Sequence, residues 1–227
     1  MNSSTADPSP GPNPDASTDP ASGPEVEELL ELGSATLGES GARLASPRLR
    51  AAWPGAKVAG PVLPVRCTPG DNLAVHVAVA AARPGSVLAV DVGQVAERGY
   101  WGEVLTVAGL ARGIAGLVID GGVRDVEALA RHRFPVFSAT VALRGATKQW
   151  PGSVGRPVRV GGASAEPGDW LVADADGVVV LPGPRLSEVV AAGRARSDKE
   201  QEYFRVLRGG TTTVELLGLD ASPISVE

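Results

Sequence analysis

The clearest chemical signal in this sequence of 227 residues is a group of charged side chains near the ends of predicted strands. Arg124 and Asp125 follow a mainly apolar strand predicted over residues 115–120, after two glycines that allow a ligand close to the backbone. Glu103 lies at the start of a helix predicted over residues 102–112. Because ligands of open α/β sheets bind beyond the carboxyl ends of parallel strands, we expect these groups to share one site.

These residue types suit the binding of a small α-keto acid together with a divalent metal. The first turn of the helix near Glu103 offers free N–H groups and the positive end of the helix dipole to an anion. Arg124 adds a fixed cation, and Glu103 and Asp125 add carboxylates. A structural explanation stays open at this point, in which Asp125 only caps the next helix and Arg124 is solvated.

Catalysis by histidine or cysteine has few candidate residues in this sequence. The chain holds one cysteine and two histidines, and we interpret Cys67 and His76 as packing residues and His132 as a cation at a helix C-terminus. The sequence contains no nucleophile elbow, phosphate-binding loop or paired-cysteine metal motif. The segment at residues 174–177 is similar to part of a calcium loop, but apolar residues follow it, so a hairpin turn explains it better.

Composition separates an N-terminal leader from the rest of the chain. Residues 1–24 are rich in proline and contain no valine, leucine, isoleucine or aromatic residue, so we expect them to be disordered and not to be a signal peptide. The net charge is −5, and the acidic residues before position 32 account for it. An acidic protein without a clustered basic surface is not expected to bind nucleic acid. No apolar run reaches the roughly 18–20 residues that would span a membrane, so we expect a cytoplasmic protein that does not bind a membrane.

Alternating hydrophobic patterns predict an α/β fold with a mixed sheet. Strands and helices alternate between residues 71 and 139, which favours parallel strands covered by helices. A strand over residues 57–66 contains Pro61 and Pro64, so we expect it to lie at a sheet edge or to be irregular.

The second half of the chain has a different pattern. Short strands separated by turn residues indicate antiparallel pairing, and a long charged helix follows them. The strands are predicted at residues 156–160, 170–173 and 178–181, and the helix at 186–207. The predicted organisation is a disordered leader over residues 1–24, an α/β/β core domain over 25–183 and a C-terminal helical arm over 184–227.

Glu103, twenty intervening residues and then Arg124-Asp125 resemble the acid-x20-Arg-Asp signature of the 4-hydroxy-4-methyl-2-oxoglutarate aldolases. The same family includes proteins like the regulator of ribonuclease activity A. Four further segments match its habitual sequence, in order, within about residues 34–217: Trp53-Pro54-Gly55, Pro69-Gly70-Asp71-Asn72-Leu73, the run at 113–121, and the paired runs at 167–170 and 174–180. Their order and spacing together make the resemblance specific.

The resemblance implies a metal-dependent class II pyruvate aldolase with oxaloacetate decarboxylase activity. Such an enzyme cleaves 4-hydroxy-4-methyl-2-oxoglutarate and similar 4-hydroxy-2-keto acids through a pyruvate enolate, which Mg²⁺ or Mn²⁺ and an arginine stabilise. The resemblance also implies a β/β/α swivelling-domain-like sandwich with a mixed sheet and a long C-terminal helix. The expected assembly is a homotrimer or a hexamer built from two trimers.

The family's substrate and metal contacts fall on five positions of this chain. By resemblance, Asp125 would be the direct metal ligand, and Arg124 would bind the pyruvyl carbonyl or enolate oxygen. The backbone that begins at Gly102, with the N–H groups of Val104 and Leu105, would hold the substrate carboxylate. These assignments agree with the cation, the carboxylate and the anion site that the residues alone suggest.

Two acids complete the implied catalytic set. Glu103 would hold a water molecule on the metal, and Glu200, on the long terminal helix, would come from a neighbouring subunit. Glu103 departs from the aspartate that is often found in the family, and its side chain is longer. The loop over residues 91–94 departs as well, since Val92 stands where catalytic members have a glycine-richer run and would narrow the pocket.

A non-catalytic function is the alternative, in which the same trimer masks a ribonuclease or a helicase through protein–protein binding. The founding regulator of the family supports it, and a fold by itself does not determine a function. The helix over residues 184–207, which carries Glu200 and which the small regulator type lacks, favours the enzyme. A methyltransferase acting on menaquinone precursors is rejected because the chain has no glycine-rich nucleotide loop.

Overall fold

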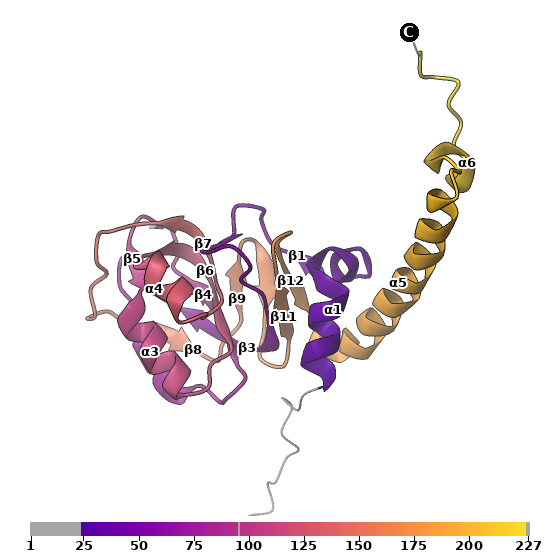
Figure 1. The fold of residues 1–227 in the computed structure, drawn as a ribbon. Helices are drawn as coiled ribbons and strands as arrows, with labels where there is room; N and C mark the ends of the chain where they lie inside the picture. The colour runs from indigo at the N-terminus through magenta and orange to yellow at the C-terminus, as the bar shows by residue number, and fades with distance from the viewer. Residues whose placement is uncertain (1–23, 95, 226–227) are drawn as a thin grey trace, which may run out of the picture.

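The computed structural model describes residues 24–94 and 96–225 of the chain. The predicted disordered leader, apart from its last residue, lies outside the described residues. The described part contains a ten-stranded mixed sheet, a separate two-stranded sheet and the helices that pack on them (Figure 1). None of its helices combines the length and the apolar character that crossing a membrane requires.

Four neighbouring strands form the parallel part of the main sheet, as the alternating pattern predicts. They lie in the order β3, β4, β6, β7, and each adjacent pair is parallel. A helix connects each strand to the next, and a short strand, β5, runs parallel to the end of β6. The elements are β3 (Val58–Arg66), α2 (Leu73–Ala81), β4 (Val87–Asp91), β5 (Gly99–Trp101), α3 (Glu103–Ala111), β6 (Gly116–Val123), α4 (Val126–Arg131) and β7 (Val136–Val141).

The other part of the main sheet is antiparallel, which confirms the predicted mixed sheet. It continues from β3 through β11 and β12 to β1, while β2 and β8 pair with β7 and β3. β9 and β10 form the two-stranded sheet. The bounds are β1 (Arg43–Leu44), β2 (Arg50–Ala51), β8 (Ser153–Val154), β9 (Val158–Val160), β10 (Ala163–Ala165), β11 (Trp170–Ala173) and β12 (Val178–Leu181).

The strand with two prolines, β3, lies in the middle of the main sheet, so an edge position is wrong, while its pairing is irregular, as the other alternative predicts. Its first half, as far as Pro61, pairs with β11, and its second half, from Val62, pairs with β4. Where a strand changes its partner, one of its sides has no neighbouring strand over part of its length. A proline can stand there because its missing N–H costs no hydrogen bond between strands.

Side chains that alternate between the two faces of the parallel strands build two layers of core. In β4, Leu88 and Val90 pack with buried residues of α2, α3 and α4, including Leu105. Their neighbours Val87 and Ala89 pack on the other face with residues of β9 to β12. The result is the predicted β/β/α sandwich. The loops after β5 and β6 lead directly into α3 and α4, which belong to its helical layer.

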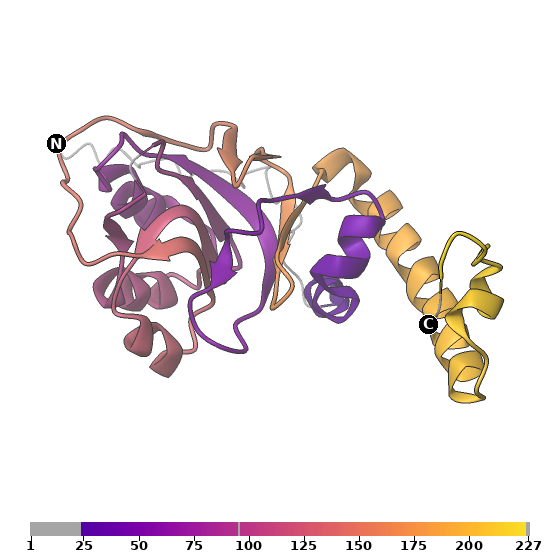
Figure 2. The same cartoon turned by 90° about the horizontal axis from the view of Figure 1, so that it is seen from above.

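The chain ends in a helical arm. Its elements are η1 (Gly183–Arg185), α5 (Leu186–Arg208) and α6 (Thr213–Leu217), and α1 (Pro24–Glu39), which bends at Gly33, packs on the first part of α5. Figures 1 and 2 both show the rest of α5 extending away from the sheet. The long C-terminal helix agrees with the prediction, and the division into domains at residue 183 stays a prediction.

Candidate functional site

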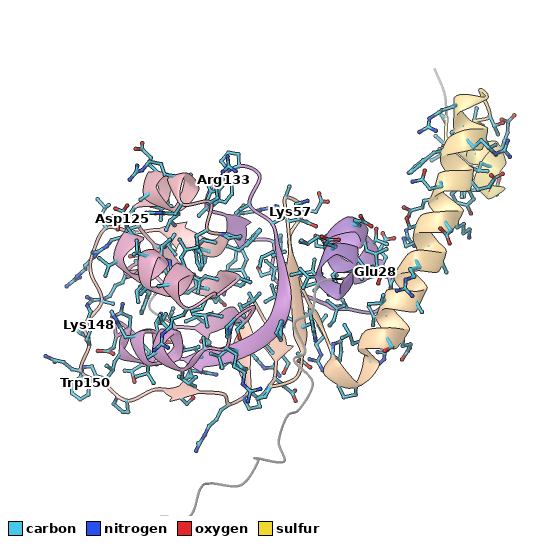
Figure 3. All side chains as sticks on the ribbon, turned by 60° about the horizontal axis from the view of Figure 1, so that its bottom comes forward. Glu28, Lys57, Asp125, Arg133, Lys148 and Trp150 are labelled. Carbon is cyan, nitrogen blue, oxygen red and sulfur yellow. The ribbon has the colours of Figure 1, made fainter. Side chains whose placement is uncertain are left out.

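A cavity of about 210 Å³ opens where β5 and β6 end and where α3 and α4 begin. Five of the predicted site residues line it: Gly102, Val104, Leu105, Arg124 and Asp125. Figure 3 shows Asp125 on the helical side of the sandwich, far from the terminal arm. The structure therefore brings together the groups that the sequence places beyond neighbouring strand ends.

Asp125 stands in an unusual backbone conformation that aims its carboxylate at the start of α3. Its φ of 57° lies in the left-handed region, which residues with a side chain seldom adopt and which is often found at functional sites. It is the N-cap residue of α4, yet its side chain makes no capping hydrogen bond there. Instead its Oδ2 accepts a hydrogen bond of 3.0 Å from the backbone N–H of Glu103. The capping explanation for Asp125 is therefore wrong.

Arg124 lies beside Asp125 and is fixed through its backbone. Its N–H donates to the carbonyl of Trp101 at 2.9 Å, and its Nε lies 3.8 Å from Asp125 Oδ2. The Arg124 side chain is 44% exposed, so the guanidinium can contact a ligand. Gly102 makes room for both residues, because a Cβ at that position would overlap Asp125 Oδ2 and approach Arg124 Cγ to 3.1 Å.

The first turn of α3 forms the anion-binding wall of the cavity. Since the helix begins at Glu103, the N–H groups of Val104 and Leu105 have no partner within it. Buried Thr106 fixes this turn, because its hydroxyl donates to the Gly102 carbonyl at 3.1 Å and accepts from Trp101 Nε1 at 2.8 Å. The free N–H groups are thus held in place before any ligand arrives, as an anion site needs.

Glu103 reaches the site with its backbone but not with its carboxylate. Its Oε1 lies 3.0 Å from His132 Nε2 and 3.6 Å from the guanidinium of Arg131, and Glu103 is not among the residues that line the cavity. The side chain is 45% exposed. Its predicted contact with a water molecule on a metal stays a prediction.

Glu200 does not line this cavity. It lies on the extended part of α5, where its carboxylate pairs with Arg196 at 2.9 Å. Figure 1 shows α5 at the opposite end of the sheet from α3 and α4. Within one chain Glu200 is therefore remote from Asp125, and a shared site requires a second copy of the chain, as the prediction already assumes.

Three polar residues that line the cavity were not predicted as site residues: Asn72, His76 and Lys148. Asn72 and His76 stand four positions apart at the start of α2, a spacing that places both on one face of a helix. That spacing was the available signal for His76, although its apolar neighbours in the sequence favour a packing residue. Lys148 comes from the loop after β7, and no local pattern in the sequence connects that loop with α2.

Among the residues that the structure describes, a single carboxylate, that of Asp125, lines the cavity. Within the described residues no cluster of three or more histidine, cysteine, aspartate or glutamate side chains could hold a metal. Mg²⁺ keeps several of its waters and often takes only one or two carboxylates, and Mn²⁺ also favours oxygen ligands. Because the Asp125 side chain is 43% exposed toward solvent, this donor set fits such an ion and does not fit zinc, which takes at least three protein ligands.

Comparisons with known proteins agree with this geometry. Residues 25–180 match the RraA-like family, described as Aldolase/RraA. A relative from Halalkalibacterium halodurans, named "Putative 4-hydroxy-4-methyl-2-oxoglutarate aldolase", is 35% identical over 151 residues, which make up 66% of this chain and 72% of the relative.

Two solved structures share the fold. An uncharacterized protein from Pseudomonas syringae pv. tomato has a TM-score of 0.75 at 28% identity and covers 83% of this chain and 90% of its own. Streptomyces coelicolor RraAS2, described as an unusual member of the RNase ES inhibitor RraA protein family, has a TM-score of 0.69 at 28% identity and covers 81% of this chain and 96% of its own.

The matched segment contains the whole parallel part of the sheet and all the residues that line the cavity. Both the sequence and the fold therefore lead to one assignment. This chain belongs to the RraA-like family, the group described as Aldolase/RraA.

Proposed function

We propose that this protein is a divalent-metal-dependent pyruvate aldolase that cleaves 4-hydroxy-4-methyl-2-oxoglutarate-type keto acids and decarboxylates oxaloacetate. The observation that carries the proposal is the single cavity shared by Arg124, Asp125 and the first turn of α3. A guanidinium, a carboxylate and free N–H groups are the groups that an α-keto acid and a hard cation need together. The printed name of the relative from H. halodurans agrees with this reaction class.

The keto acid binds through its first two carbons. Its C1 carboxylate accepts hydrogen bonds from the N–H groups of Val104 and Leu105 at the positive end of α3. Its C2 oxygen accepts from Arg124, whose planar guanidinium can donate two hydrogen bonds at once. These contacts leave C3 and C4 free to extend into the remainder of the cavity.

Both reactions break the C3–C4 bond and leave its electron pair in a pyruvate enolate. In the aldol cleavage the C4 hydroxyl loses its proton and C4 leaves as a carbonyl group, whereas C4 of oxaloacetate leaves as CO₂. A proton then adds to C3 to give pyruvate. Arg124 faces the negative charge that develops on the C2 oxygen, and a preorganised donor of this kind typically contributes about 2.7–4 kcal/mol to transition-state stabilisation.

Asp125 is the proposed ligand for Mg²⁺ or Mn²⁺, which when bound supplies the positive charge that polarises the keto group. The Glu103 N–H holds the Asp125 carboxylate in place through its Oδ2. We retain for the Glu103 side chain the proposed contact with a nearby water, which requires it to leave His132. Glu200 is proposed to enter from a neighbouring subunit of a trimer or hexamer.

The proposal is tested by measuring pyruvate formation with lactate dehydrogenase as the coupling enzyme. Oxaloacetate and 4-hydroxy-4-methyl-2-oxoglutarate should both give pyruvate when Mg²⁺ or Mn²⁺ is present, and a chelator should stop the reaction. Asp125→Ala should abolish the metal-dependent activity. Absence of metal-dependent pyruvate from both substrates, with the protein folded, would contradict the proposal.

The alternative is a non-catalytic regulator of ribonuclease activity that acts by protein–protein binding. The similarity to S. coelicolor RraAS2, whose description names an RNase inhibitor family, favours it. The Asp125→Ala substitution distinguishes the two functions. It removes the proposed metal ligand, which the aldolase requires and which protein–protein binding does not require. A chain that forms no pyruvate, but inhibits a ribonuclease equally well as wild type and as Asp125→Ala, would support the regulator.

A further inference from the structure

A second cavity, of about 400 Å³, lies where β3 changes its partner, and it shares no lining residue with the candidate site. β11 pairs with β3 as far as Pro61, and β8 pairs with it only from Val65. One side of β3 therefore has no neighbouring strand between these residues. Trp170, at the start of β11, and Gly155, next to β8, border this gap and line the cavity. Its volume is in the range of sites that hold a ligand.

The walls of this second cavity are mainly apolar. Four prolines line it, whose rings fix the local backbone: Pro61, Pro64, Pro84 and Pro167. Trp170 is only 5% exposed, and its indole N–H has no hydrogen-bond partner among the described residues. This N–H is also not one of the side-chain atoms that are closed off from solvent without a partner. It is therefore free to donate a hydrogen bond into the cavity.

Arg83 gives the rim of the second cavity a positive charge. Its side chain is exposed and forms no ion pair within the described residues. Among those residues, no aspartate or glutamate lines the cavity. The complementary occupant therefore has an apolar surface, a hydrogen-bond acceptor for the indole and a negative charge for Arg83.

The N-terminal leader of this chain has these three properties. Its prolines at positions 8, 10, 12 and 14 supply ring surface, Asp7 and Asp15 flank them, and residues 1–23 contain no lysine or arginine. Proline-rich sequences favour the polyproline II helix, whose carbonyl groups have no internal partner and can accept hydrogen bonds. Aromatic grooves recognise such segments because little conformational entropy is lost on binding. A segment of this kind can dock without the valine, leucine and isoleucine that the leader lacks.

The leader joins the described part of the chain near this second cavity. α1 begins at Pro24, and Val26 packs in the same apolar cluster as Trp170. A polyproline II helix rises about 3.1 Å per residue, so the stretch between residues 14 and 24 can span about 30 Å. Because the leader is tethered, its effective concentration at the cavity is millimolar, and weak contacts are enough to keep it docked.

We propose that residues 7–15 of the leader dock in this second cavity of their own chain. The proline rings pack on Trp170 and on the prolines of the wall, and the indole N–H donates to a carbonyl of the leader. Arg83 pairs with one of the two flanking aspartates. The inference goes beyond the proposed function and does not depend on it, because the candidate active site is a separate cavity.

The contact is measured in the full chain with bimane, a dye that tryptophan quenches on contact. Ser9→Cys places a thiol within the proline run, and the dye labels it alone because Cys67 is buried. Emission should rise at least about twofold in Trp170→Phe, since a segment at millimolar effective concentration is docked most of the time. Trp150→Phe is the matched control: Trp150 is 57% exposed and does not line this cavity, so emission should not change.

A charge reversal tests the same contact without changing the core. Arg83→Glu should raise the emission as Trp170→Phe does, because a glutamate repels the acidic leader. Lys148→Glu is its control, since Lys148 is an exposed lysine at the candidate active site, which Figure 3 labels beside the helical layer. Unchanged emission in Trp170→Phe and Arg83→Glu would overturn the proposal. A rise in Lys148→Glu alone would place the leader at the other cavity and overturn it as well.

Two further measurements test the prolines and the source of the docked leader. An excess of a synthetic peptide of residues 7–15 should displace the leader and raise the emission, whereas the same peptide with alanine at its four prolines should not. Equal displacement by both peptides would overturn the role of the prolines. When labelled Trp170→Phe is co-refolded with excess unlabelled wild type, emission should stay high. Renewed quenching would show that the leader reaches the cavity of a neighbouring subunit, which overturns docking within one chain.

Discussion

The Oδ2 atom of Asp125 accepts a hydrogen bond from the backbone N–H of Glu103, although the two residues belong to different strand–helix connections. This bond joins the start of α3 to the start of α4 and places the carboxylate next to the free N–H groups of the first turn of α3. It uses the backbone of Glu103 and leaves the Glu103 side chain to His132. The cation, the acid and the anion site therefore lie side by side at the junction of these two connections.

Gly102 is required at this junction for steric reasons alone. Its φ of −162° is open to any residue, but a Cβ there would overlap Asp125 Oδ2. Gly102→Ala should displace the carboxylate and lower metal-dependent pyruvate formation about a hundredfold, with a small change in Tm. Gly177→Ala is the control, since nothing lies within 4 Å of a Cβ at that position. Full activity in Gly102→Ala would show that the Asp125 carboxylate can move without loss.

Because the backbone of Asp125 is left-handed, substitutions at this position should affect the stability and the activity of the protein in different ways. A residue with a side chain costs about 1–2 kcal/mol more than glycine in this conformation. Asp125→Gly and Asp125→Ala should both be inactive, because both lose the carboxylate, but Asp125→Gly should be the more stable by about 1 kcal/mol. Chemical denaturation measures the free energy of unfolding of each variant. Equal stabilities would mean that the local backbone relaxes when the side chain is removed.

Arg124→Lys tests the role of the planar guanidinium. Lysine keeps the charge but offers a point donor in place of the fork, so stabilisation of the enolate oxygen should be lost in the transition state. We expect kcat to fall by about 10²–10³-fold with a smaller change in KM, measured by steady-state kinetics with oxaloacetate. Arg159→Lys, at an exposed position on β9, should behave as wild type. An unchanged kcat in Arg124→Lys would exclude a contact with the enolate oxygen.

Glu200 offers a test of a site shared between subunits. Co-refolding of Glu200→Ala with Asp125→Ala should restore part of the wild-type activity, because some sites then combine an intact Asp125 with an intact Glu200 from the neighbour. Co-refolding of Asp125→Ala with Arg124→Ala is the control and should restore none, since both residues belong to one chain's cavity. No rescue in the first mixture would remove Glu200 from the site.

Cys67 should be unreactive in the folded protein. It is 3% exposed, and burial, together with the charges of Asp71 and Asp91, raises the pKa of its thiol to about 12. Only the thiolate reacts with iodoacetamide, so at pH 8 the native chain should stay unmodified while the chain in denaturant is alkylated at its single cysteine. Mass spectrometry reads both states. Rapid labelling of the native chain would show that α2 opens away from the sheet.

Local pattern was enough to predict much of this protein. The alternation of apolar strands with helices between residues 71 and 139 predicts the parallel half of the sheet, and the later turn-rich strands predict the antiparallel half. The predicted strand over residues 115–120, followed closely by Arg124 and Asp125, places a cation and an acid at one sheet edge. These inferences hold because periodicity and strand ends depend on neighbours in the chain, and parallel strands end on the same side.

Tertiary structure alone decided the central place of β3, the partner of the Asp125 carboxylate and the turn of the Glu103 side chain toward His132. It also brought Lys148, from a distant loop, to Asn72 and His76. Each of these features depends on which distant segments of the sequence pack together. It also depends on which hydrogen-bond partners are available after they have packed. A local pattern carries no information on either, because the same residue types can be paired, capped or solvated until the packing of the whole chain selects one partner.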